Sequence, residues 1–133
     1  MLGAAGIEVL AGDLLRVCGV AVYGSPSQPR LPKGRPQMAF GRRRGAELKA
    51  EWARIPAAGV DILMTHTPPM GILDISDYDG KHTGCEELAR AVARAGPVAH
   101  VFGHVHGCHG VHRSKRTLFL NASSAGGRRG EGG

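Results

Sequence analysis

Apolar residues recur with helical spacing in two segments of the chain. In residues 45–55, GAELKAEWARI, the side chains of Leu48, Trp52 and Ile55 follow the i, i+4, i+7 spacing that places them on one face of a helix. Residues 85–95, CEELARAVARA, are strong helix formers and are followed directly by a glycine–proline pair that stops a helix. The pattern therefore predicts two helices.

Other segments carry the apolar patterns of strands. VDILMTH, residues 60–66, and VAHVFG, residues 98–103, are short, nearly continuous apolar runs, which are typical of strands buried on both faces. Near the N-terminus, GIEVL and LLRVCGVAVYG predict two short strands around the turn AGD. Near the C-terminus, residues 110–123, GVHRSKRTLFLNAS, predict a hairpin with Ser-Lys at its turn.

The alternation of helices with buried strands predicts one α/β domain over residues 1–124. We expect a mixed sheet with flanking helices and a hairpin at each end. Residues 25–45 contain four prolines and no hydrophobic period, so they predict a loop. Residues 125–133 form a glycine-rich tail that we expect to be disordered.

The charge distribution changes this picture only slightly. The formal net charge is +6, and the basic residues from Arg30 to Arg44 lie in a proline- and glycine-rich stretch without an acid. Basic blocks in flexible segments are more often solvated than used to read bases. We therefore expect no nucleic-acid partner, and rather a weak attraction to phosphorylated molecules.

Cysteine usage and hydropathy indicate the compartment. Cys18, Cys85 and Cys108 are odd in number and widely spaced, which predicts reduced thiols rather than a disulfide framework. The N-terminus lacks the basic segment of a secretory signal, and no apolar run approaches the roughly 20 residues that span a bilayer. These features predict a cytoplasmic protein that does not contact membranes.

Histidines follow two of the predicted buried strands. His66 ends ILMTH, and His104 ends VFGH, so both belong to the sheet edge where α/β proteins gather functional groups. His106 lies two residues after His104, on the same side of an extended segment. A single histidine after a strand is usually a polar cap, but the three together favour a metal site.

Cys108 and His109 extend the histidine cluster and offer an alternative. With His104 and His106 they would form a local zinc site, but their spacing matches no zinc-finger pattern. We expect His100 to be packed or paired within its strand and His112 to lie at the surface.

Further polar residues predict structural roles. DISDYDG contains Asp74, Asp77 and Asp79. In the register of an EF-hand calcium loop the first ligand would be Ile75, which has no oxygen on its side chain, so the segment predicts a solvated loop. Asn121 ends a strand, where we expect it to satisfy backbone groups. Cys85 opens the second helix and is expected to pack in the core.

Taken in order, several segments resemble one family. VYGSP, AFGRRRGAELKAEWARIP, DILMTHTPPMGILD, HTGCEELARAV, HVFGHVH and TLFLNASS resemble the calcineurin-like metallophosphoesterases, and within them the MPPED-like subgroup. The resemblance covers roughly residues 6–124 and implies the C-terminal half of that family's αββα sandwich.

The resemblance also implies ligands and chemistry. In this family two divalent cations, often Mn, Fe or Zn, share a hydroxide that attacks phosphorus in a phosphoester substrate. His66 and His104 match ligands of the second metal, and His106 matches a ligand of the first. No residue of this chain matches a catalytic group outside the metal ligands.

The family's remaining ligand motifs are absent from the 133 residues. Asp-x-His, Gly-Asp-x-x-Asp and Gly-Asn-His-Asp/Glu do not occur, and two cations beside three neutral imidazoles would repel each other without an anionic ligand. We therefore expect a phosphoric ester hydrolase, a phosphomonoesterase or phosphodiesterase, that is inactive or impaired as this chain alone. The alternative is a non-catalytic fragment or remnant that binds metal weakly or acts as an interaction module. Half a sandwich leaves apolar surface exposed, which predicts self-association.

Overall fold

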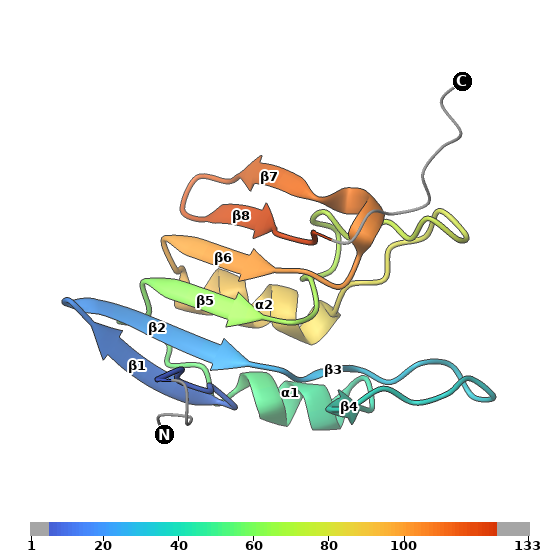
Figure 1. Cartoon of the computed structure of the whole chain (residues 1–133), viewed down its shortest axis with the longest axis horizontal. Helices are drawn as coiled ribbons and strands as arrows, with labels where there is room; N and C mark the ends of the chain where they lie inside the picture. The colour runs from blue at the N-terminus through green and yellow to red at the C-terminus, as the bar shows by residue number, and fades with distance from the viewer. Residues whose placement is uncertain (1–5, 125–133) are drawn as a thin grey trace.

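A computed structural model describes residues 6–124 as a six-stranded mixed sheet with two α-helices (Figure 1). The strands of this sheet are β1 (Asp13–Val17), β2 (Val20–Ser25), β5 (Ile62–Thr65), β6 (Ala99–Phe102), β7 (Gly110–Arg113) and β8 (Leu118–Asn121). The helices are α1 (Ala46–Trp52), α2 (Glu86–Ala95) and one 3-10 turn, η1 (His106–Cys108). A short pair, β3 (Gln28–Pro29) and β4 (Gly41–Arg42), lies beside the sheet.

The sheet has the strand order β1-β2-β5-β6-β8-β7. The four central strands run parallel, and β1 and β7 pair antiparallel at the two edges as the first and last hairpins of the sheet. This arrangement confirms the predicted α/β fold with a mixed sheet, flanking helices and terminal hairpins. Because the central strands are parallel, their carboxyl ends meet at one edge, which we call the carboxyl edge (Figure 1).

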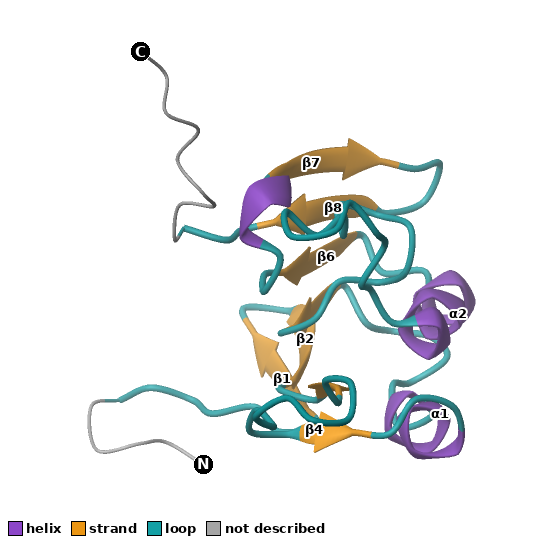
Figure 2. Cartoon of the chain, turned by 90° about the vertical axis from the view of Figure 1, so that its right-hand side faces the viewer, coloured by secondary structure: helices purple, strands orange, loops and turns teal. Residues whose placement is uncertain are grey.

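Both helices cover the same face of the sheet (Figure 2). The amphipathic spacing predicted from the sequence places Leu48 and Trp52 of α1 and Leu88 and Val92 of α2 in the core, all with at most 4% of their surface exposed. Every second residue of the central strands packs against these helix side chains. These strand residues are Tyr23, Leu63, His100, Phe102 and Phe119.

The opposite face of the sheet is apolar and has no helix on it. The register aligns Leu15 with Val22, and it aligns Met64, Val101 and Leu120 with one another on this side. These five residues, which we call the open face, are half-buried or exposed, and Met64 is 47% exposed. Strands with apolar residues on both faces are typical of sheets that are covered on both sides.

The first hairpin corrects one prediction. GIEVL does not form a strand of the sheet, and the turn lies at Cys18-Gly19 rather than at AGD. Cys18 and Gly19 have φ angles of 49° and 79°, and two successive positive φ values are what a tight two-residue hairpin turn requires. Leu10 of GIEVL instead packs on Gly24, where an added Cβ would lie 2.5 Å from the Leu10 Cβ.

The other predicted elements are found with shorter bounds. Residues 25–45 form a long loop in which only β3 and β4 pair. The glycine-rich tail, residues 125–133, lies outside the described residues. Within residues 6–124, no helix has the length and apolar character needed to cross a lipid bilayer.

Candidate metal centre

The backbone brings His66 and His104 together at the carboxyl edge. His66 directly follows β5, and the N–H of Gly103, just after β6, donates to the His66 carbonyl at 3.1 Å. This bond continues the pairing of β5 with β6 beyond the strands themselves. The residues just past the ends of these parallel strands therefore lie side by side, as the sequence predicted. His66 is the first residue after β5, and His104 is the second after β6.

The two imidazole rings are in contact. Nε2 of His66 lies 3.0 Å from Nδ1 of His104, and the ring centroids are 4.8 Å apart with 61° between the planes. His104 has a φ of 68°, a left-handed conformation, which turns its side chain back toward His66.

Partial burial and mutual repulsion lower the pKa values of both imidazoles. Desolvation lowers the pKa of His66, and the charge of His106 lowers it further. The pKa of His104 is lowered by desolvation first, then by His66 and His106. Neutral imidazoles are the form that binds metal ions.

His106 begins the turn η1, which follows His104 closely. The Asn121 side-chain amide, at the end of β8, donates to the carbonyl of Val105 at 2.9 Å and to that of Leu73 at 3.1 Å. The predicted role of Asn121 is thereby confirmed. The amide fixes the residue between His104 and His106, so it holds the backbone from which both imidazoles project.

The neighbouring residues do not join the cluster. The Cys108 thiol donates to the carbonyl of Ile75 at 3.2 Å, and His109 is exposed. His112 is exposed, as predicted, although its ring lies 6.0 Å from that of Phe119. Across residues 6–124, no group of three or more His, Cys, Asp or Glu side chains is gathered closely enough to hold a metal ion.

His100 is buried and paired, as the sequence predicted. Its Nε2 lies 2.8 Å from the Thr65 hydroxyl, which itself donates to the Thr67 carbonyl at 2.8 Å. The hydroxyl proton is therefore used, so Nε2 must carry the hydrogen and donate it to Thr65. Nδ1 is then an acceptor, and it has no hydrogen-bond partner among the described residues. Burial lowers the pKa of His100 to about 3.

The predicted solvated loop has Asp77 and Asp79 exposed, as expected, but the prediction is wrong for Asp74. Its side chain is fully buried and accepts hydrogen bonds from the N–H groups of Gly71 and Gly84, both at 2.9 Å, and lies 2.6 Å from Nδ1 of His82. Gly84 must be glycine, because a Cβ there would lie 2.5 Å from the Pro69 carbonyl oxygen. The carboxylate closes the loop that follows His66, and only the tertiary structure shows it.

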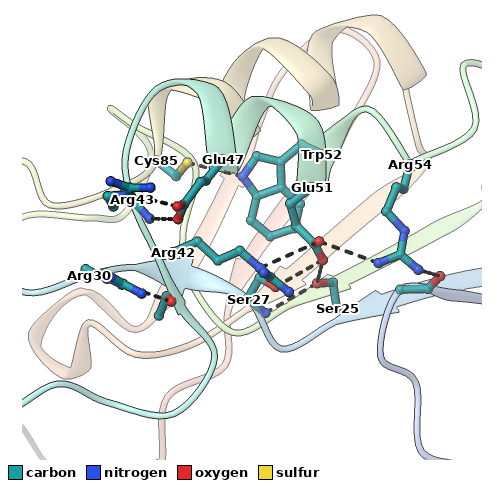
Figure 3. A network of polar contacts seen from close by, with 12 residues as sticks. Ser25, Ser27, Arg30, Arg42, Arg43, Glu47, Glu51, Trp52, Arg54 and Cys85 are labelled. Carbon is teal, nitrogen blue, oxygen red and sulfur yellow. Dashed lines mark hydrogen bonds and ion pairs between the residues drawn. The ribbon is translucent and has the colours of Figure 1, made fainter.

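A second buried carboxylate fixes the end of β2 (Figure 3). Glu51 accepts hydrogen bonds from the hydroxyls of Ser25 and Ser27, both at 3.0 Å. Arg54 and Arg42 lie 3.5 and 3.8 Å from its other oxygen. Ser25 pairs with Thr65, the residue before His66, so this network supports the strand next to the histidines.

Cys85 lies in the core, as predicted. It is 1% exposed, and the indole N–H of Trp52 donates to its sulfur at 3.2 Å. Cys18, Cys85 and Cys108 are all free thiols. The contact joins α1 to the start of α2.

Sequence comparison finds related proteins with longer chains. The chain is 43% identical over 108 residues to metallophosphoesterase domain-containing protein 1 of Homo sapiens, which covers 80% of this chain and 32% of that protein. It is 40% identical over 113 residues to UPF0046 protein T07D4.2 of Caenorhabditis elegans, which covers 84% of this chain and 27% of that protein. The chain thus spans about a third of the length of these relatives. They confirm the resemblance to the MPPED-like subgroup.

Comparison of the fold gives a compatible result. A solved crystal structure aligns with 90% of this chain and 47% of its own, with a TM-score of 0.62 and 19% sequence identity. At this identity the match shows the fold alone. No family model matches the chain.

Proposed function

We propose that this chain, which resembles the MPPED-like metallophosphoesterases over about four fifths of its length, carries part of the metal centre of a phosphoric ester hydrolase. The observation that supports this best is the pairing of His66 with His104 at 3.0 Å on the carboxyl edge. The resemblance assigns these two residues to one cation and His106 to a second.

The donor set fits a divalent cation. Metal–nitrogen bonds to imidazole are about 2.0–2.1 Å long, so two nitrogens that bind one cation lie about 3 Å apart at a right angle and about 3.3 Å apart at a tetrahedral angle. The 3.0 Å between Nε2 of His66 and Nδ1 of His104 is also a hydrogen-bond distance, and a small separation of the rings would admit a cation between the two nitrogens. Imidazole is a good ligand for Zn and Fe, two of the three metals that the resemblance implies, whereas Mn prefers oxygen ligands.

The residues of this chain have defined tasks in such a site. His66 and His104 would hold one cation through facing ring nitrogens, and desolvation lowers the pKa of both rings, which favours the unprotonated form that binds metal. Asn121 keeps the backbone before His106 in place. A bound divalent cation would supply Lewis acidity at the phosphoryl oxygens and lower the pKa of water.

A second candidate function is a non-catalytic module that binds metal weakly. The observation that favours it is that, in residues 6–124, no third His, Cys, Asp or Glu side chain joins His66 and His104 in a group that could hold a metal ion. Without an anionic ligand, a second cation would be repelled by the first. In that case the chain would bind one cation and would not hydrolyse phosphoesters.

Calorimetric titration with Mn²⁺ and Zn²⁺ tests the metal centre. We expect His66→Ala and His104→Gly to weaken binding by at least about tenfold, as loss of a supporting or direct ligand does. Glycine at position 104 tolerates the left-handed backbone. His109→Ala is the matched control, because it removes an exposed imidazole outside the pair and should leave the affinity unchanged.

Hydrolysis of bis(p-nitrophenyl) phosphate separates the two functions. Turnover with Mn²⁺ that is lost in His104→Gly supports the hydrolase. Metal binding without turnover supports the non-catalytic module. Equal metal affinity of the parent chain and His104→Gly would contradict both, because both assign the cation to this histidine.

A further inference from the structure

A strongly basic loop follows β2, and the neighbouring strand β5 ends directly before His66. Residues 30–44, which we call the basic loop, contain six cations and no acid, and all six are exposed. These cations are Arg30, Lys33, Arg35, Arg42, Arg43 and Arg44. Figure 1 shows the loop extending past the edge at which β5 and β6 end.

Both ends of the basic loop are fixed to the carboxyl edge. The loop follows the end of β2, where Ser25 pairs with Thr65, the residue before His66. At its other end, Arg44 donates to the carbonyls of Gly84 and Thr83 at 2.9 and 3.2 Å. The loop is thereby tied to the segment that packs against the residues following His66.

Four of the six cations form no ion pair in the described part of the chain, although Arg30 still interacts electrostatically with the Glu47 carboxylate. In the described part of the chain, Arg43 pairs with Glu47 at 2.7 Å and Arg42 lies 3.8 Å from Glu51 (Figure 3). Arg30 and Arg44 donate only to carbonyl oxygens. Lys33 and Arg35 form no ion pair within residues 6–124. One phosphate needs one or two cations, so this density of free charge suits a ligand with several phosphates.

The basic loop also displays an aromatic ring. Phe40 is 61% exposed, and its backbone has a φ of 59°, which is unusual for a bulky residue. Gln28, which is buried, fixes this backbone: its N–H donates to the Phe40 carbonyl at 3.2 Å, and its side-chain amide donates to the Ala39 carbonyl at 2.9 Å. An exposed ring on a fixed backbone, among unpaired cations, is the arrangement on which an unpaired base stacks.

From these contacts we infer that the basic loop binds single-stranded nucleic acid, with Phe40 stacking on a base and the free cations neutralising the phosphodiester backbone. The role of this nucleic acid as substrate rests on the proposed function, whereas its binding does not. The sequence alone predicts no nucleic-acid partner, because basic blocks in flexible segments are usually solvated. The fixed backbone and the 61% exposure of Phe40 are visible only in the fold.

Fluorescence anisotropy with labelled dodecathymidine, in EDTA and over a range of NaCl concentrations, tests the binding. Four neutralised phosphates give a slope of log K against log salt of about −3, from about −0.7 for each phosphate on a single strand. We expect the double variant Lys33→Glu, Arg35→Glu to weaken binding at least about tenfold and to make the slope shallower. Phe40→Ala should weaken binding about fivefold to tenfold without changing the slope.

The chain offers a control with the same sign of charge change. Lys115 is exposed in the turn between β7 and β8, at the opposite edge of the sheet. If Lys115→Glu weakens binding as much as Lys33→Glu alone, net charge accounts for the affinity and the inference is overturned. The inference is also overturned if polyglutamate binds as tightly and Phe40→Ala has no effect, because the loop then selects acidic protein. Circular dichroism of each variant shows that its fold is intact.

The two proposals fail in different ways. Oligonucleotide binding is measured in EDTA and does not depend on the metal centre. Hydrolysis of bis(p-nitrophenyl) phosphate without oligonucleotide binding overturns the inference about the basic loop and leaves the proposed function intact. Oligonucleotide binding without metal binding supports the inference and contradicts the proposed function.

Discussion

Lowering the pH from 7.5 to 4.5 should destabilise the fold through one buried imidazole, that of His100. This ring is fully buried between Phe102 and Phe119, with ring centroids 5.0 and 5.8 Å away. Its Nε2 hydrogen is used by Thr65, and Nδ1 faces no partner that would accept a proton. A second proton would therefore leave a charge without compensation inside the core.

The magnitude follows from the two pKa values. An unfolded chain protonates this imidazole near pH 6.5, whereas the pKa in the folded chain is about 3. Between these values only the unfolded chain binds the proton, so the free energy of unfolding falls as the pH falls, by about 1.4 kcal/mol per pH unit. At pH 4.5 the loss from His100 alone is about 3 kcal/mol. Above pH 6.5 the residue contributes no pH dependence.

Urea denaturation at half-unit pH intervals measures this effect. His66 and His104 also have lowered pKa values and act in the same direction, so the comparison needs a variant that removes only His100. His100→Phe keeps a planar ring in the core and cannot titrate. The difference in the free energy of unfolding between the two chains should be constant above pH 6.5, and below it should change in favour of His100→Phe by about 1.4 kcal/mol per unit. Curves that stay parallel down to pH 4.5 would refute the assignment of a depressed pKa to His100.

Three further predictions concern packing, charge and association. Gly84→Ala should lower the free energy of unfolding by about 1–3 kcal/mol, because its Cβ would meet the Pro69 carbonyl. An equal loss in Gly103→Ala, where the φ angle is not positive and a Cβ would meet only the Ser123 hydroxyl at 3.6 Å, would contradict this. Glu51→Gln should lower the free energy of unfolding, measured by urea denaturation, by about 1 kcal/mol. The loss should be smaller in 1 M NaCl, because the arginine partners of Glu51 are half-exposed and salt screens them. A loss independent of salt would exclude an electrostatic cause. The open face should cause concentration-dependent self-association in sedimentation experiments, reduced by Val101→Lys; a parent chain monomeric at all concentrations would contradict this prediction.

The sequence predicted the helices and central strands because their patterns are local. The spacing of Leu48 and Trp52 and the apolar run that contains Leu63 identify elements without knowledge of their partners. The first hairpin was misplaced for a conformational reason. Cys18 adopts a left-handed backbone that favours glycine and asparagine, so the residue types around AGD were the stronger turn signal.

The proximity of His66 and His104 could be predicted from the order of the strands. His66 and His104 meet because parallel strands end at one edge, and this rule needs only the succession of buried strands. Asp74 could not be found in the same way. Its burial depends on amides contributed by Gly71 and Gly84, which a long loop of irregular backbone brings around it. Such a loop has no hydrophobic period from which its closure can be read.

The left-handed backbone of His104 has a consequence for how the stability of this chain relates to its chemistry. A side chain with a Cβ in this conformation costs about 1–2 kcal/mol relative to glycine. With φ at 68°, His104→Gly should therefore unfold at a higher urea concentration than the parent chain, although it removes an imidazole from the pair. Position 104 is thus one where a gain in fold stability and the loss of a functional group come from the same substitution. If His104→Gly is more stable and no longer binds metal, the His104 imidazole supports metal binding and lowers the free energy of unfolding.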